Sequence, residues 1–165
     1  MKKSNKDLEY KKNIGWDSNE LNEKEIEVLT KEYQQFLSDN KTEREVFNFC
    51  KELLIKNGFK DAESTKFFLT HKGKNIGIVN MNNKDLSQGA NIIVAHIDCP
   101  RLDLKPNPLY EDSDLAYLKT HYYGGIKKYH WVTRALALHG VVFTSNGEKI
   151  EVSIGEDEKD PILMI

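Results

Sequence analysis

The sequence predicts an α/β fold in which two helices precede a small sheet and a second, β-rich unit. Three observations predict this fold: two helical stripes of apolar residues, a β-branched run at 92–95, and alternating runs separated by turn residues. The chain has 165 residues, of which 39% are hydrophobic and 30% are charged. This length and composition suit a soluble globular protein with one core.

The first two elements are predicted to be amphipathic helices. The first helix ends at Asp39-Asn40, and Thr42 followed three residues later by Glu45 is a capping box that begins the second. Gly58 stands where a glycine that ends a helix belongs. The apolar stripes that define the two helices are Leu21, Ile26, Leu29, Tyr33, Phe36 and Leu37, then Val46, Phe47, Cys50, Leu53 and Leu54.

Turn residues divide most of the remaining chain into hairpins. Residues 66–70 and 75–79 form one predicted hairpin, and a polar loop is expected at 82–89. The prolines and acidic residues between 106 and 114 mark a boundary or a long loop, beyond which the chain is β-rich. The strongest hairpin signal joins residues 136–144 to 149–154. Its Asn146-Gly147 dipeptide favours a type I′ turn.

A short apolar strand is predicted over residues 91–95, and it leads to a His-x-Asp pair. Pro100 cannot continue the ladder, so the strand is expected to end near His96 and Asp98. Because positions two apart share one face of a strand, both side chains then point into the cleft where α/β sheets bind ligands. The imidazole can bind a metal ion, and the carboxylate can orient its ring. The alternative is a histidine that merely bonds to the aspartate at a sheet edge.

Charge and composition exclude several classes of partner. The net charge of −2 gives no basic surface for nucleic acid and little attraction to anionic lipid. No membrane span is evident, and no apolar core of a signal peptide follows the N-terminal lysines, so a cytoplasmic location is expected. Cys50 and Cys99 are then reduced and serve packing. His71, His130 and His139 lack ligand spacing and are interpreted as turn, surface and strand-packing residues.

Four segments together resemble the aspartyl aminopeptidase family of dinuclear-metal exopeptidases. These segments are residues 95–108, 120–126, 136–140 and 154–161. The resemblance implies that residues 1–100 are the N-terminal part of a zinc-exopeptidase-like α/β catalytic domain. It also implies that residues 101–165 are the first part of an inserted, β-rich domain for dimerisation and active-site lining.

The resemblance also assigns site residues. In that family the histidine that matches His96 is a metal ligand, and the aspartate that matches Asp98 is the catalytic-site carboxylate that orients it. His121, Gly124 and Gly125 are candidates for the pocket lining or the dimer contact.

The implied function is metal-dependent removal of N-terminal residues from peptides, with acidic residues favoured. The resemblance implies a complete enzyme that uses two zinc ions, for which cobalt or manganese can substitute, and that forms a homo-oligomer. The family's other metal ligands lie beyond the point that matches Ile165, so the chain alone is expected to be inactive. Two alternatives stay open: an inactive truncated product, or an interaction subunit whose site a second chain completes.

Overall fold

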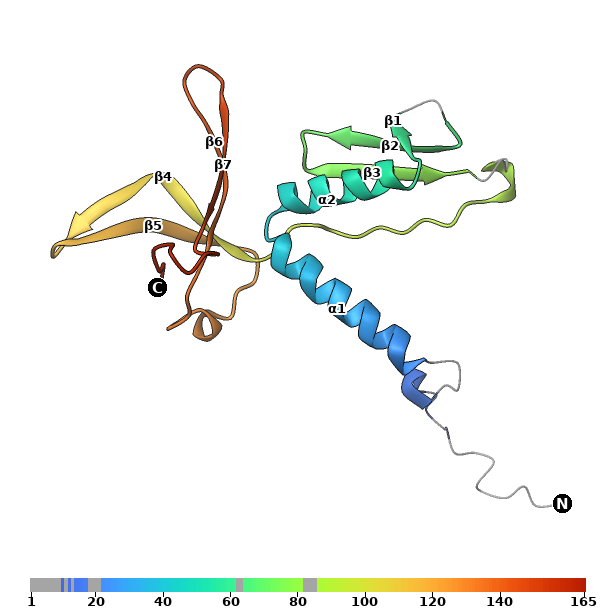
Figure 1. The fold of residues 1–165 in the computed structure, drawn as a ribbon, viewed down its shortest axis with the longest axis horizontal. Coiled ribbons are helices and arrows are strands. Elements are labelled where there is room, and N and C mark those ends of the chain that lie inside the picture. Colours follow the sequence, from blue (N-terminus) through green and yellow to red (C-terminus); the bar gives the residue numbers. More distant parts are fainter. Residues whose placement is uncertain (1–9, 11, 13, 18–21, 62–63, 82–85) are drawn as a thin grey trace. The chain divides into compact units, whose positions relative to one another are not determined.

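The computed structural model describes residues 10, 12, 14–17, 22–61, 64–81 and 86–165, and its chain is traced in Figure 1. The contacts divide the chain into two compact units, Met1–Asp39 and Asn40–Ile165. In the first unit, a 3-10 turn at Gly15–Asp17 precedes helix α1, Glu23–Asp39, which ends where the sequence predicted. Residues 1–9, 11, 13 and 18–21 of the N-terminal region lie outside the described residues. No described helix is long and apolar enough to cross a membrane.

The second unit begins with helix α2, Glu43–Lys56, whose predicted capping box is present. The Glu45 backbone N–H donates to Thr42 Oγ1 at 3.3 Å, and the Thr42 backbone N–H donates to Glu45 Oε2 at 2.8 Å. These two bonds satisfy donors that the first turn of a helix leaves without partners. Asn57 is the C-cap, and Gly58 follows it as predicted.

A three-stranded sheet follows, made of β1 (Lys60–Asp61), β2 (Lys66–His71) and β3 (Asn75–Asn80). Strands β2 and β3 form the predicted antiparallel hairpin, and β1 pairs with β2 in parallel. Figure 1 shows α2 lying along this sheet. The core of this part is small. Burial of each large apolar side chain in it stabilises the fold by about 1.5 to 3 kcal/mol. Its buried apolar residues are Val46, Phe47, Leu54 and Phe68.

The strand predicted over residues 91–95 does not form. After a 3-10 turn at Leu86–Gln88, the chain runs to β4 without any ladder partner among the described residues, and Figure 1 shows no arrow there. Ile92, Ile93 and Val94 are 82%, 95% and 88% exposed. A strand requires hydrogen-bonded neighbours, and the three-stranded sheet does not reach this segment. The apolar run is therefore unpaired rather than buried on both faces.

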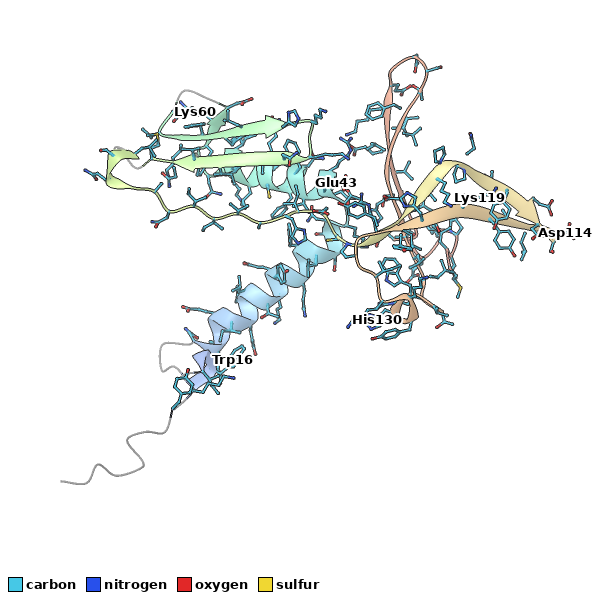
Figure 2. The ribbon with its side chains drawn as sticks, turned by 180° about the vertical axis from the view of Figure 1, so that it is seen from behind. Trp16, Glu43, Lys60, Asp114, Lys119 and His130 are labelled. Carbon is cyan, nitrogen blue, oxygen red and sulfur yellow. The ribbon has the colours of Figure 1, made fainter. Side chains whose placement is uncertain are left out.

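Residues 106–114, predicted as a boundary or long loop, belong to a long β-hairpin instead. Strand β4 (Arg101–Asp112) pairs antiparallel with β5 (Leu115–Tyr123), and a register shift between Leu104 and Leu109 accommodates both prolines. Ser113 and Asp114 have φ of 55° and 62°, as the two central residues of a type I′ turn require. Figure 2 labels Asp114 at the tip of this hairpin.

The second predicted hairpin is confirmed, with β6 at Leu138–Phe143 and β7 at Lys149–Ile154. The prediction of a type I′ turn at Asn146-Gly147 is wrong, because only Gly147 of that pair has a positive φ, of 84°. The Gly147 N–H donates to Thr144 O at 2.9 Å, and the Thr144 N–H donates to Glu148 O at 3.0 Å. This is the three-residue loop with a glycine bulge that ranks next among hairpin connections.

Candidate metal-binding site

His96 and Asp98 contact each other, although no strand aligns them. His96 Nδ1 lies 2.9 Å from the Asp98 main-chain oxygen and 3.2 Å from Asp98 Oδ1. Both acceptors face the same ring nitrogen, which favours the tautomer that carries its proton on Nδ1. The His96 side chain is 81% exposed. Nε2, which has no hydrogen-bond partner within the described ranges, then offers its lone pair outward.

Tyr123, at the end of β5, holds the other oxygen of Asp98. Its hydroxyl donates to Asp98 Oδ2 at 2.7 Å. This hydrogen bond, together with a backbone bond, keeps the pKa of Asp98 below its ordinary value, and the same bond raises the pKa of Tyr123. Asp98 is therefore an ionised acceptor at neutral pH. Sequence reasoning used the Tyr-Tyr-Gly-Gly motif only for its glycines and missed this tyrosine.

Arg101 supports Tyr123 from the opposite strand. Its guanidinium lies 4.1 Å from the centre of the Tyr123 ring, and its Nε donates to Asp103 Oδ1 at 2.7 Å. A terminal nitrogen lies 3.5 Å from Glu43 Oε2, which is in the first turn of α2. Burial lowers the pKa of Arg101, but its acidic partners outweigh this effect and raise the pKa overall. Figure 2 labels Glu43 where α2 begins.

The other predicted site residues are placed as follows. Gly124 has φ of 73°, and a Cβ built there would lie 3.5 Å from Pro100 Cα, so the backbone of Gly124 passes beside Pro100. Gly125 has nothing within 4 Å of such a Cβ. His121 is exposed in β5, with Nδ1 3.3 Å from Tyr122 O. No hydrogen bond of the described structure joins His121 to His96 or Asp98.

A second charged cluster, which the sequence did not predict, connects α2 to the β6–β7 hairpin. His139 is only 10% exposed at its side chain, and each of its ring nitrogens faces a carboxylate, from Glu45 or from Glu156. Lys41 pairs with Glu156. Burial raises the pKa of Glu45, but hydrogen bonds with His139 and Thr42 outweigh this effect, so the pKa is lowered overall. The Lys41 and His139 bonds likewise lower the pKa of Glu156.

A cleft of about 300 Å³ lies beside this cluster and not at His96. Its walls come from the start of α2, from β4 and from the β6–β7 hairpin, and they include Glu43, Arg101, Asp103 and His139. Neither His96 nor Asp98 lines it. The cleft is therefore separate from the candidate metal site.

The chemistry of the pair fits one position of a zinc site. A neutral imidazole with its second nitrogen hydrogen-bonded to a carboxylate is a common zinc ligand. Catalytic zinc takes about three protein ligands. The described residues contain no group of three or more His, Cys, Asp or Glu side chains that could hold a metal ion. His96 and Asp98 are therefore too few, among the described residues, to hold a zinc ion by themselves.

Comparison with protein families and curated proteins agrees with the resemblance seen in the sequence. Residues 36–165 match the family described as aminopeptidase I zinc metalloprotease (M18). A probable M18 family aminopeptidase 1 from Borrelia garinii subsp. bavariensis is 43% identical over 163 residues, which cover 94% of this chain and 36% of the relative. Its counterpart from Thermotoga maritima is 45% identical over 148 residues, which cover 86% of this chain and 33% of that protein.

Solved structures give the same result. The M18 aminopeptidase of Thermotoga maritima matches with a TM-score of 0.80 at 41% identity, over 93% of this chain and 35% of that one. Aminopeptidase I of Borrelia burgdorferi matches with a TM-score of 0.75 at 40% identity, over 88% and 38%. This chain spans about a third of the length of the relatives it matches. Because the family match covers most of its residues, the chain belongs to the M18 family of zinc metalloaminopeptidases, the aspartyl aminopeptidase family.

Proposed function

We propose that this chain supplies the zinc ligand His96 and the orienting carboxylate Asp98 to the dinuclear centre of an aminopeptidase. The observation that carries the proposal is the contact of His96 Nδ1 with both oxygens offered by Asp98, which leaves Nε2 free within the described structure. Membership of a zinc metalloprotease family supports it. Residues 1–100 would then belong to the catalytic domain and 101–165 to the inserted dimerisation domain.

The residues of this chain would prepare the ligand and hold it in place. Asp98 accepts a hydrogen bond from the Nδ1–H of His96 and would so fix the tautomer that binds metal through Nε2. Tyr123 keeps Asp98 ionised and oriented. Zinc, when bound, polarises the scissile carbonyl and lowers the pKa of a bound water. The substrates would be peptides, with acidic N-terminal residues favoured, and the assembly a homo-oligomer.

The chain on its own is proposed to be inactive. The described residues offer only His96 as a placed ligand, and a single imidazole binds zinc weakly compared with three. Activity would appear only when the remaining ligands are joined to it. The part of the relatives that this chain does not cover is the natural source of those ligands.

A chimera tests this proposal. The chain is fused to the portion of the Thermotoga maritima relative that the alignment leaves uncovered, and both proteins are loaded with zinc. Release of a fluorophore from aspartyl, glutamyl and leucyl amides is then measured. We expect activity from the chimera and none from the chain alone. His96→Ala is expected to abolish it, and the control His71→Ala, at an exposed histidine of β2, to retain it.

An interaction subunit completed by a second chain is the other candidate. The exposed run Ile92 to Val94 favours it, because apolar segments without strand partners attract other chains. Mixing this chain with the uncovered portion of the relative as a separate polypeptide tests it. Activity after mixing supports the two-chain enzyme, whereas activity from the covalent chimera alone supports a single polypeptide. Full activity of the isolated 165-residue chain would contradict both.

A further inference from the structure

The carboxylate of Asp98 is held at both oxygens by groups from different parts of the second unit. Oδ1 lies 3.2 Å from His96 Nδ1, and Oδ2 accepts from the Tyr123 hydroxyl at 2.7 Å. Tyr123 lies 25 positions after Asp98 in the sequence. A carboxylate bonded at one oxygen only can rotate away from its partner. The bond from Tyr123 removes that freedom.

The placement of Tyr123 depends on the β4–β5 hairpin. Arg101 and Tyr123 are direct partners in the antiparallel register, and their side chains stack at 4.1 Å. Cross-strand neighbours of this kind stabilise each other. Arg101 is in turn held by Asp103 at 2.7 Å and by Glu43 at 3.5 Å. The tyrosine ring is therefore fixed by charged groups from both β4 and α2.

The backbone after Tyr123 fixes the distance to the Asp98 segment. Gly124 adopts φ of 73°, and a Cβ at this residue would lie 3.5 Å from Pro100 Cα. The end of β5 thus lies directly against the residues that follow Asp98. This approach places the hydroxyl within hydrogen-bonding range of the carboxylate.

We propose that Tyr123 is a positioning residue: by bonding Asp98 Oδ2 it turns Oδ1 toward His96 Nδ1 and so holds the imidazole as the tautomer whose Nε2 is available to a metal ion. Arg101 acts behind it by fixing the ring. The tautomer is a property of this chain alone. Its use by a metal rests on the proposed function.

Imidazole 15N NMR of the 165-residue chain tests the tautomer directly. Spectra are recorded at a pH above which the imidazole 15N shifts no longer change, so that only the neutral ring is observed. We expect His96 to be mainly the Nδ1–H form. Tyr123→Phe keeps the ring and removes the donor, and it is expected to shift His96 toward the Nε2–H form. Asp98→Ala is expected to shift it further in the same direction.

Two controls separate positioning from a general structural effect. Tyr122→Phe removes a neighbouring hydroxyl that has no bond to Asp98, and the His96 signal is expected to stay unchanged. The His71 signal, from the hairpin β2–β3, is expected to stay unchanged in every variant, because no hydrogen bond or ion pair of the described residues joins His71 to Asp98 or Tyr123. Circular dichroism of each variant verifies that it folds. If Tyr123→Phe folds and leaves the His96 tautomer as in the unmodified chain, the proposal is overturned. A tautomer that Asp98→Ala also leaves unchanged overturns it as well, because the main-chain oxygen then suffices.

Zinc affinity of the chimera connects the tautomer to the metal. Competition with a chromophoric chelator is expected to show zinc binding weakened by up to about tenfold in Tyr123→Phe, the lower end of effects for groups behind a metal ligand. Tyr122→Phe is expected to bind as the unmodified chimera does. A tautomer shift in a chimera whose activity survives His96→Ala would refute the proposed function and leave the positioning role intact. Unchanged tautomer and affinity in Tyr123→Phe, with activity lost in His96→Ala, would refute the positioning role alone.

Discussion

Glu45 Oε1 lies 2.7 Å from Nδ1 of His139, a residue 94 positions further along the chain. The other ring nitrogen lies 2.8 Å from Glu156 Oε1. Carboxylates only accept hydrogen bonds, so both contacts are full bonds when each nitrogen carries a proton. The glutamate that caps α2 through Oε2 thus ties the β6–β7 hairpin to the helix through Oε1.

Acid is expected to weaken this connection. The pKa values of Glu45 and Glu156 are lowered in the folded chain, so both carboxylates stabilise the fold above their ordinary pKa of 4.5. That contribution is lost as the pH falls below 4.5 and through the lowered pKa values that the two carboxylates have in the folded chain. Thermal unfolding followed across this range measures it. Glu156→Gln is expected to flatten the acid dependence, and Glu158→Gln, an exposed carboxylate outside the cluster, to preserve it.

Removal of the imidazole is expected to destabilise the second unit. His139→Ala deletes the contacts of the imidazole with two carboxylates, which together contribute about 2 kcal/mol at a partly exposed site. Urea titration followed by circular dichroism gives the free energy of unfolding. His71→Ala, at the exposed end of β2, is the control and is expected to change this free energy by less than ~0.5 kcal/mol. Equal stabilities of the two variants would show that the contacts of His139 contribute nothing to stability.

The two glycines after Tyr123 are expected to respond differently to a methyl group. Gly124→Ala forces a side chain into a left-handed conformation at φ of 73° and against Pro100, and about 1 kcal/mol of stability should be lost. Gly125→Ala meets open space and is expected to be neutral. Denaturant midpoints of the pair decide the matter. A neutral Gly124→Ala would contradict the left-handed backbone conformation at this residue.

The isolated chain is expected to self-associate through its exposed apolar run. Ile93 is 95% exposed in a segment that has no strand partner among the described residues, and such segments pair with other chains. Sedimentation velocity over a concentration series should show larger species as the protein concentration rises. Ile93→Lys is expected to reduce them, whereas Leu86→Lys, at a side chain that is 67% exposed in a 3-10 turn, should not. A monomer at every concentration would count against this surface as a contact.

Local signals predicted local structure well. The capping box of Thr42 and Glu45, the break at Asp39 and both predicted hairpins are present because each depends on residues a few positions apart. Turn type was less predictable. The type I′ turn expected at Asn146-Gly147 occurs instead at Ser113-Asp114, where the acidic composition had suggested a loop. Backbone conformation there follows the register of the flanking strands as well as the turn residues.

Features that depend on distant residues were not predictable. The run at 92–94 has the composition of a buried strand, but a strand also needs partners that composition does not supply. The convergence of His96 with Asp98 was expected from strand alternation, and it arises through local bonds instead. Tyr123 and His139 reach their carboxylates across 25 and 94 positions, so no spacing rule indicated them.

The register shift in β4 has a consequence for how the β4–β5 sheet can grow. Pro106 and Pro108 lack backbone N–H groups, so β4 has two residues in this stretch that cannot donate a backbone hydrogen bond to a neighbouring strand. An incoming strand would lose hydrogen bonds there. Strand β5 contains no proline between Leu115 and Tyr123. A strand that paired with β5, the strand that ends in the tyrosine bonded to Asp98, would meet no residue that lacks this donor.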